Sequence, residues 1–188
     1  MDNCYAHAIC ISYFKVKDFK ILEEIFKSGY ILSRNEQRKQ GKRNVSNSII
    51  TACFNGMDYI SLCDLMMSHD GYSSYDMYIR KGLSLLLDRD LSVIKPKLID
   101  QNDFMYFNTY TFCGKERFTD LIDEVQVKDQ ISLKHLLGIS LSLSVFRSFH
   151  DEEYLINYLK YVNFIQDKYN YDVPIYNLDD KSLIKIKK

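Results

Sequence analysis

The chain carries no excess of either charge. Lys plus Arg and Asp plus Glu both total 25, so the formal net charge at pH 7 is zero. Such a balance produces no global field that would attract nucleic acid or an anionic membrane surface. Contact with nucleic acid would therefore depend on a local basic patch, of which the best is 34–43, RNEQRKQGKR. Because this patch has no aromatic side chain for base stacking, we expect a solvated loop there, with a phosphate-contacting loop as the alternative.

The cysteines show no CxxC pair and no regular spacing, which argues against a structural zinc site and against a disulfide framework. They are typical of reduced thiols in a reducing compartment, and we expect no metal site. No local motif marks one of them as a catalytic nucleophile, although the histidines could approach one in space. The five residues are Cys4, Cys10, Cys53, Cys63 and Cys113.

The chain also lacks a long apolar run. The opening MDNCYAHAICIS has no basic start, and its apolar stretch is too short and too interrupted for a signal peptide or a membrane span. No later segment reaches spanning length. We therefore expect no membrane partner and a cytoplasmic location, either in the producing cell or in a host cell reached by a secretion route that needs no cleaved signal.

With 188 residues, of which 46% are hydrophobic, the chain is long enough to bury a sizeable core. No internal repeat or low-complexity linker divides it. We expect one globular domain at 1–149 and, at 150–188, a C-terminal helix and tail packed on the same domain.

The N-terminal part predicts a strand followed by a helix. Residues 6–14, AHAICISYF, combine β-branched and aromatic side chains in an extended pattern. In 17–28 the apolar side chains recur at helical spacing, and Asp18 is placed to support the helix N-terminus. Gly29 then occupies the position that follows a helix end. A helix is thus expected to pack on a sheet.

The later elements are mostly short strands. We expect strands at 58–63, 83–88, 124–127 and 136–146, with a turn or short helix at 128–136. In 151–169 the apolar side chains form one helical stripe, which predicts a final packing helix with Asp151 near its start. The closing KSLIKIKK, 181–188, is expected to fray. Together these elements indicate an α+β fold class.

Three segments, taken in order, resemble a known family. They are LEEIFKSGYILSRNEQ at 22–37, DYISL at 58–62 and EVQVKDQISLKHLLGI at 124–139. This order resembles the ADP-ribosyltransferase fold, above all its bacterial toxin and effector branch, which includes the DarT-like enzymes. The resemblance extends over 5–143. It implies a split mixed or antiparallel sheet with flanking helices and a C-terminal helix, with NAD as the substrate and a protein or nucleic acid as the acceptor.

In that family a glutamate at the start of a late strand stabilises the oxocarbenium-like ribose as nicotinamide leaves, and the resemblance assigns this role to Glu124. A carboxylate beside such a cation stabilises the transition state more than the ground state. In an extended strand Glu124, Gln126 and Lys128 would share one face. The alternatives are an ordinary edge-strand charge at Glu124 and a role for the neighbouring Asp123. Because Ile122 stands where arginine-modifying members carry Glu or Gln, an arginine acceptor is not expected.

The resemblance also suggests which residues contact NAD. His7, on the first strand, would grip a ribose or the nicotinamide amide. Tyr59 would stack on nicotinamide, with Ser61 on the same face of the strand, and Tyr75 and Tyr78 are the alternatives for the stacking ring. Ser33 and Arg34 follow the first helix, where the family places a segment that faces phosphate or ribose, and arginine can fork onto a diphosphate. An ordinary structural role is the alternative for each of the five.

The segment GKERFTDLID, 114–123, precedes the proposed catalytic glutamate, and in this fold that place belongs to the loop that recognises the acceptor. The resemblance points to Arg117 and Phe118 as its contacts.

The sequence therefore predicts a mono-ADP-ribosyltransferase of the toxin or effector type. Three alternatives stay open. The first is a catalytically inactive module of the same fold that binds a nucleotide or a protein. The second is an RNA 2′-phosphotransferase that uses the basic segment 34–43. The third is an effector or immunity protein that occupies a partner's surface, with the tyrosine-rich final helix supplying an apolar patch.

Overall fold

The structure, a computed structural model, describes residues 3–9, 12–41, 58–66, 79–94 and 124–185. It has the expected α+β class, with a mixed sheet in the strand order β5-β3-β1-β4-β7-β8. All neighbours in this sheet are antiparallel except β7 and β8, which run parallel. The strands are β1 (Tyr5–Ala8), β3 (Tyr59–Asp64), β4 (Ser84–Leu87), β5 (Glu124–Lys128), β7 (Leu136–Leu141) and β8 (Ile175–Asn177).

Two further strands form a separate antiparallel ribbon. They are β2 (Tyr30–Leu32) and β6 (Gln130–Ser132), which pair with Ile31 opposite Ile131. A 3₁₀ turn, η3 (Leu133–His135), then leads into β7. The segment expected to be a turn or short helix thus contains a short strand before its helical turn, so that expectation is only half correct.

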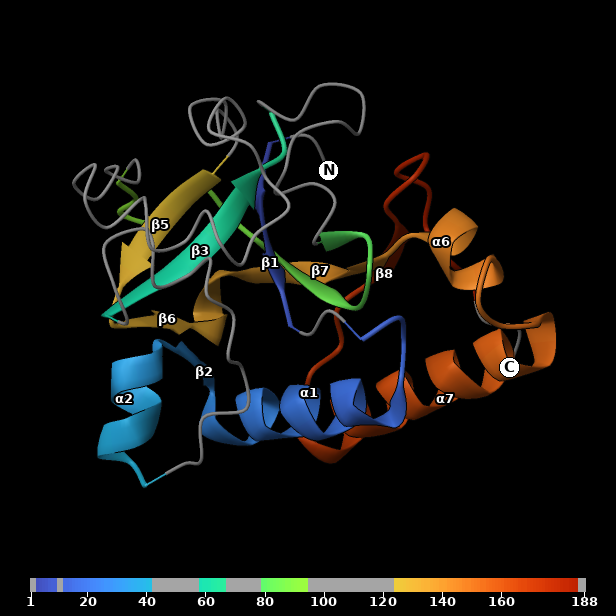
Figure 1. Cartoon of the computed structure of the whole chain (residues 1–188), viewed down its shortest axis with the longest axis horizontal. Helices are drawn as coiled ribbons and strands as arrows, with labels where there is room; N and C mark the ends of the chain where they lie inside the picture. Colours follow the sequence, from blue (N-terminus) through green and yellow to red (C-terminus); the bar gives the residue numbers. More distant parts are fainter. Residues whose placement is uncertain (1–2, 10–11, 42–57, 67–78, 95–123, 186–188) are drawn as a thin grey trace, which may run out of the picture.

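Two long helices, α1 (Val16–Ser28) and α7 (Glu152–Lys168), lie side by side across one face of the sheet, as Figure 1 shows. Their ends follow the sequence signals. Gly29 closes α1 in the left-handed conformation, with φ of 74°, and Asp151 caps α7 by accepting a hydrogen bond from the Tyr154 N–H at 2.8 Å. The predicted apolar stripe of α7 is buried, at Leu155, Tyr158, Leu159, Val162 and Ile165.

The core lies on both faces of the sheet. The larger cluster fills the space between the sheet and the helix pair, and it includes Leu22 and Phe26 of α1 and the inward residues of every strand in the sheet. A smaller cluster covers the opposite face. It consists of Cys4, Ala6, Cys63, Ile79, Leu86 and Leu178. No helix within the described ranges is long and apolar enough to cross a membrane.

The basic segment after β2 begins as a helix, α2 (Arg34–Lys39), where a solvated loop is expected from the sequence. Ser33 caps this helix, because its hydroxyl accepts a hydrogen bond from the Glu36 N–H at 3.3 Å. Glu36 also pairs with Lys39 one turn later. The expectation of a loop is therefore wrong for 34–39, since a capping serine with an acidic residue three positions on favours a helix start.

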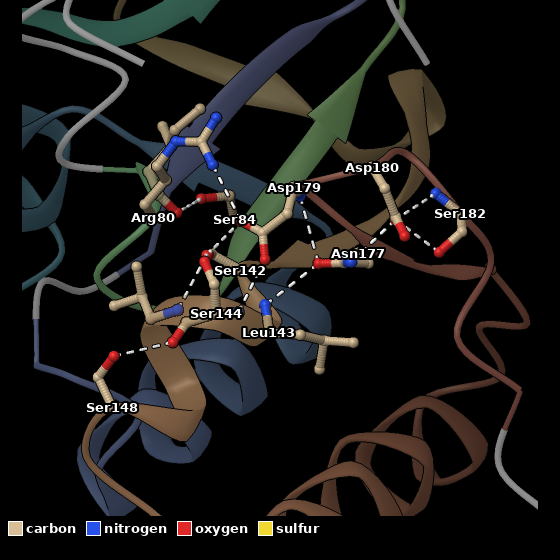
Figure 2. Close-up of polar contacts among 12 residues, drawn as sticks. Arg80, Ser84, Ser142, Leu143, Ser144, Ser148, Asn177, Asp179, Asp180 and Ser182 are labelled. Carbon is tan, nitrogen blue, oxygen red and sulfur yellow. Dashed lines mark hydrogen bonds and ion pairs between the residues drawn. The ribbon is translucent and has the colours of Figure 1, made fainter. Parts of the chain in front are cut away.

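The strand expected at 136–146 is also too long, because β7 ends at Leu141. Ser142 then caps the short helix α6 (Leu143–Arg147) by accepting from the Val145 N–H at 3.2 Å. Figure 2 shows that residues after β8 make hydrogen bonds to the N-terminus of α6. Asp179 accepts hydrogen bonds from the Ser142 hydroxyl at 2.6 Å and from the Ser144 N–H at 2.7 Å. Arg80 donates to the same carboxylate at 3.0 Å.

The C-terminal tail is more ordered than its charged sequence suggests. After β8 the chain turns back, with Tyr176 bridged to Leu183 and the Ile184 N–H bonded to the Ile175 carbonyl at 2.8 Å. The prediction of a frayed tail is therefore wrong up to Lys185. The reason is backbone pairing with β8 across a turn, which the charged composition of the tail does not indicate.

The first strand is shorter than predicted, and the chain enters α1 through a tight loop. Tyr13 and Phe14 adopt left-handed φ angles of 55° and 60°, which are uncommon outside glycine. Asp18 lies in the first turn of α1, as the sequence predicts, and it also has a role that the sequence does not indicate. Its fully buried carboxylate accepts a hydrogen bond from the Tyr158 hydroxyl at 2.8 Å and another from the Ser12 hydroxyl. The carboxylate thus ties this loop to α7.

Candidate functional site

A row of polar side chains lies at the edge of the sheet, on β5 and β3. Glu124 is the first residue of β5, and Gln126 is paired in register with Ser61 of β3. The Gln126 amide Nε2 lies 3.2 Å from Glu124 Oε1 and 3.4 Å from Ser61 Oγ. Glu124 is 1% exposed and Gln126 is 0% exposed. The row is therefore a hydrogen-bonded network that is withdrawn from bulk water.

Strand alternation explains how the sequence EVQV builds this row. Val125 and Val127 point to the opposite face, where they belong to the main hydrophobic core. The outer edge of β5 is paired as well, because Ile94 exchanges two backbone hydrogen bonds with Gln126, at 2.9 and 2.8 Å. With partners on both sides, the backbone at Gln126 is held firmly.

His7 reaches the same region from β1. The pairing of β1 with β3 covers only Tyr5 with Asp64 and Ala6 with Cys63, so the two strands part just before His7. At that point His7 Nδ1 lies 3.1 Å from the Ser61 carbonyl oxygen, to which a neutral ring donates. Burial lowers the pKa of His7, and the hydrogen bond to the carbonyl opposes this effect in part.

His7 does not share the face of the sheet that carries Glu124. Along β1 it alternates with Ala6 and is in phase with Tyr5, whose side chain belongs to the core on the helix side. The contact between His7 and the row runs through the main chain of Ser61. The structure thus brings His7, Ser61 and Glu124 into one neighbourhood, with His7 approaching from the other side.

Tyr59 stands at the far end of the row from Glu124. It is half-buried, opens β3, and pairs in register with Lys128. Because Ser61 is two residues further along the strand, Tyr59 and Ser61 share a face, as the sequence predicts.

Ser33 and Arg34 lie beside the end of β5 remote from Glu124. The Ser33 N–H donates to the Asp129 carbonyl at 2.7 Å, immediately after β5, and the Ser33 hydroxyl serves as the cap of α2. The two ends of β5 are four residue steps apart, a distance of about 13 Å. Partial burial, and the nearby charge of Arg38, lower the pKa of Arg34. These two residues are therefore not gathered with Glu124.

Arg117 and Phe118, which the sequence suggests as acceptor contacts, lie outside the described residues. The same holds for Asp123 and for the alternative stacking residues Tyr75 and Tyr78.

The sequence does not mark Gln126 as a site residue, although strand alternation from Glu124 could have placed its side chain on the same face.

The sequence analysis also gave no sign of an ion pair at the end of β3. There Arg89 forks onto Asp64, with nitrogen to oxygen distances of 2.7 and 2.9 Å, and lies over the Tyr5 ring at 4.7 Å. The Asp64 carboxylate raises the pKa of Arg89. Within the described part of the chain, no three metal-ligating side chains come together.

The chemical capability of the row follows from burial and charge. A carboxylate in a water-poor site interacts with a nearby cation more strongly than it would in water. A fixed donor beside it lowers the reorganisation needed when positive charge develops in front of the carboxylate. Glu124 is therefore suited to stabilise a cationic transition state.

Comparison with known proteins gives matches by structure alone. No protein-family model matches the chain, and no curated protein is significantly similar to it in sequence. The similar solved structures are ADP-ribosyltransferases. They are DarT proteins, the same kind of enzyme that the sequence motifs resemble.

Two of these structures come from Thermus sp. 2.9 DarT. The complex with ADP-ribosylated ssDNA has a TM-score of 0.49 and 13% identity, over 95% of both chains. The complex with NAD⁺ has a TM-score of 0.48 and 12% identity, over 95% of this chain and 96% of that one. Thermosipho africanus DarTG in complex with ADP-ribose has a TM-score of 0.48 and 13% identity, over 93% of this chain and 49% of that one. At these values the similarity assigns no role to any residue of the present chain.

Proposed function

We propose that this protein is an NAD-dependent mono-ADP-ribosyltransferase that transfers ADP-ribose from NAD to a protein or a nucleic acid. The observation that supports the proposal most directly is the position of Glu124. It is a buried carboxylate at the first residue of an edge strand, beside the point where β1 and β3 part. The proposed setting is that of a toxin or effector acting in a cytoplasm, its own or that of a host.

The proposed reaction breaks the bond between the nicotinamide nitrogen and C1′ of the ribose. Nicotinamide leaves with the bonding electrons, so positive charge develops on the ribose. The acceptor then supplies the electron pair of the new bond to C1′ and releases its proton to water. Glu124 would stabilise that charge, and its contribution counts in the rate because the cation exists only near the transition state.

The remaining roles are proposals of the same kind. Ser61 would contact the nicotinamide ribose end of NAD, since it belongs to the row that contains Glu124, and His7 would act there through the main chain of Ser61. Tyr59 stays a proposed NAD contact, at the end of the row remote from Glu124. Ser33 and Arg34 would act at the other end of the strand pair, where a dinucleotide lying along β5 would place a phosphate or its second ribose. Arg117 and Phe118 stay as proposed acceptor contacts.

The test is transfer of label from NAD carrying a radioactive adenylate. Single-stranded DNA, which carries ADP-ribose in one of the structures named above, and a protein extract are offered in separate reactions. We expect label in one acceptor with the wild-type protein and none with Glu124→Gln. Glu153→Gln, an exposed change on α7, serves as the matched control and should transfer as the wild type does.

A catalytically inactive module of the same fold would give a different result. It would raise its melting temperature when NAD is added, because a ligand that binds only the folded state stabilises it, yet it would release no nicotinamide. If NAD does not change the melting temperature and no label is transferred, both the transferase and the NAD-binding inactive module are contradicted. An effector or immunity protein that binds a partner's surface would then remain.

A further inference from the structure

The Gln126 side chain has an orientation that the hydrogen-bond chemistry determines. Its neighbour Glu124 can only accept when ionised, so the amide nitrogen, and not the amide oxygen, must face the carboxylate. The same nitrogen faces the Ser61 hydroxyl oxygen at 3.4 Å. The two amide hydrogens are thus directed at two acceptors, one on its own strand and one across the strand pair.

Gln126 is also the most immobilised member of the row. Its side chain is 0% exposed, and its backbone is bonded to Ile94 on one side and paired in register with Ser61 on the other. A buried amide costs free energy unless its hydrogen bonds are made, so an apolar residue would suit this strand position better if packing were the only requirement.

From this geometry we infer that Gln126 is a positioning residue: its amide holds the Glu124 carboxylate in one orientation and favours the ionised form. The effect on the carboxylate is independent of any reaction. Its consequence for catalysis rests on the function proposed above, since only an ionised and oriented Glu124 can stabilise a cationic ribose.

Other groups on this face bear on the titration of Glu124. Among the paired residues of β3 and β5, the titratable ones that alternate onto the same face are Cys63, opposite Glu124, and Tyr59 and Lys128 at the far end. Lys128 and Tyr59 are about 13 Å along the strands from Glu124, so they act on its carboxylate more weakly than the adjacent amide of Gln126 does.

The test is an NMR titration of protein labelled at the glutamate side-chain carboxyl carbon. The Glu124 signal is assigned as the one that Glu124→Gln removes. In Gln126→Leu the ionised carboxylate loses a donor, and we expect the pKa of Glu124 to rise by about one to two units, the size expected for a hydrogen bond to a charged group. An unchanged titration in this folded variant would overturn the inference.

Gln166→Leu is the matched control. Gln166 is likewise buried, on α7, where its side-chain oxygen accepts from the Val173 N–H at 2.9 Å. This variant loses a comparable buried amide, and it should leave the Glu124 titration unchanged. A shift as large as that of Gln126→Leu would show that general loosening is the cause, and would overturn the inference.

Gln126→Glu provides a second test if the leucine variant does not fold. The new carboxyl group has the same reach and would lie against Glu124, so the two should share a proton and titrate in two well-separated steps. Two independent titrations at ordinary glutamate values would overturn the inference.

Kinetics with NAD separate this inference from the proposed function. Gln126→Leu should lower kcat for nicotinamide release by about tenfold or more and leave KM for NAD within about twofold, because the lost interaction acts on the transition state. If Gln126→Leu raises the pKa of Glu124 but the wild type does not turn over NAD, the positioning role is supported and the proposed function is contradicted. If the wild type turns over NAD but Gln126→Leu changes neither kcat nor the titration of Glu124, the proposed function is supported and the positioning role is contradicted.

Discussion

The hydrogen bond between Tyr158 and Asp18 gives the sharpest stability prediction. Asp18 is fully buried, and the Tyr158 hydroxyl donates to its carboxylate at 2.8 Å. Tyr158→Phe keeps the ring, which packs on Phe14 and Phe19, and removes only this donor. A hydrogen bond to a buried charged group contributes about 1.5–3 kcal/mol, so we expect that loss in the free energy of unfolding. For a chain of this length the loss corresponds to about 3–12 °C in melting temperature.

Urea denaturation of the two proteins measures the difference directly. The matched control is Tyr161→Phe, the same change one turn along α7, because the Tyr161 ring also packs on Phe19 while the residue is 45% exposed. This control should stay within about 0.5 kcal/mol of the wild type. The reasoning would be refuted if Tyr158→Phe were as stable as Tyr161→Phe, since the buried carboxylate would then not depend on the hydroxyl.

Two further predictions concern the sheet. Burial lowers the pKa of His7, so the unfolded state binds its proton more readily, and stability that is present above about pH 6.5 is lost as the pH falls below that value. His7→Gln should therefore weaken the fall in melting temperature between about pH 7 and pH 5.5, and an unchanged pH profile would contradict the assignment. Gly138→Ala would place a Cβ 2.9 Å from the Pro174 carbonyl oxygen and 3.0 Å from the Tyr176 ring. Because β7 and β8 must then move apart, we expect the free energy of unfolding, measured by urea denaturation, to fall by about 1–3 kcal/mol. A variant as stable as the wild type would show that the two strands accommodate the methyl group without cost.

Elements with a local signal were predictable from the sequence. The apolar periodicity of α1 and α7, the left-handed Gly29 and the capping Asp151 gave the helices close to their observed bounds. Alternation in EVQV correctly placed the valines in the core and Glu124 on the other face. These features depend on neighbours within a few residues, which is the range over which periodicity and capping act.

Features made by distant partners were not predictable in this way. The buried Asp18 carboxylate receives a hydrogen bond from Tyr158, 140 residues later, and the sequence near Asp18 does not indicate this partner. β8 is a strand because β7 offers it an edge. The same holds for the site, where His7 meets the main chain of Ser61, 54 residues away. The helix start at Ser33 is different, since its serine and Glu36 carried a local signal that charge composition obscured.

The release of nicotinamide from NAD tests the central claim most directly, because it needs no knowledge of the acceptor. Glu124→Gln keeps the shape of the side chain and an oxygen that can accept from Gln126, and it removes the negative charge. We predict that the wild type and Glu153→Gln release nicotinamide at the same rate, and that Glu124→Gln is slower by about a hundredfold or more. Equal rates in all three proteins, or no release of nicotinamide by the wild type, would contradict the assignment of Glu124 as the residue that stabilises the ribose cation.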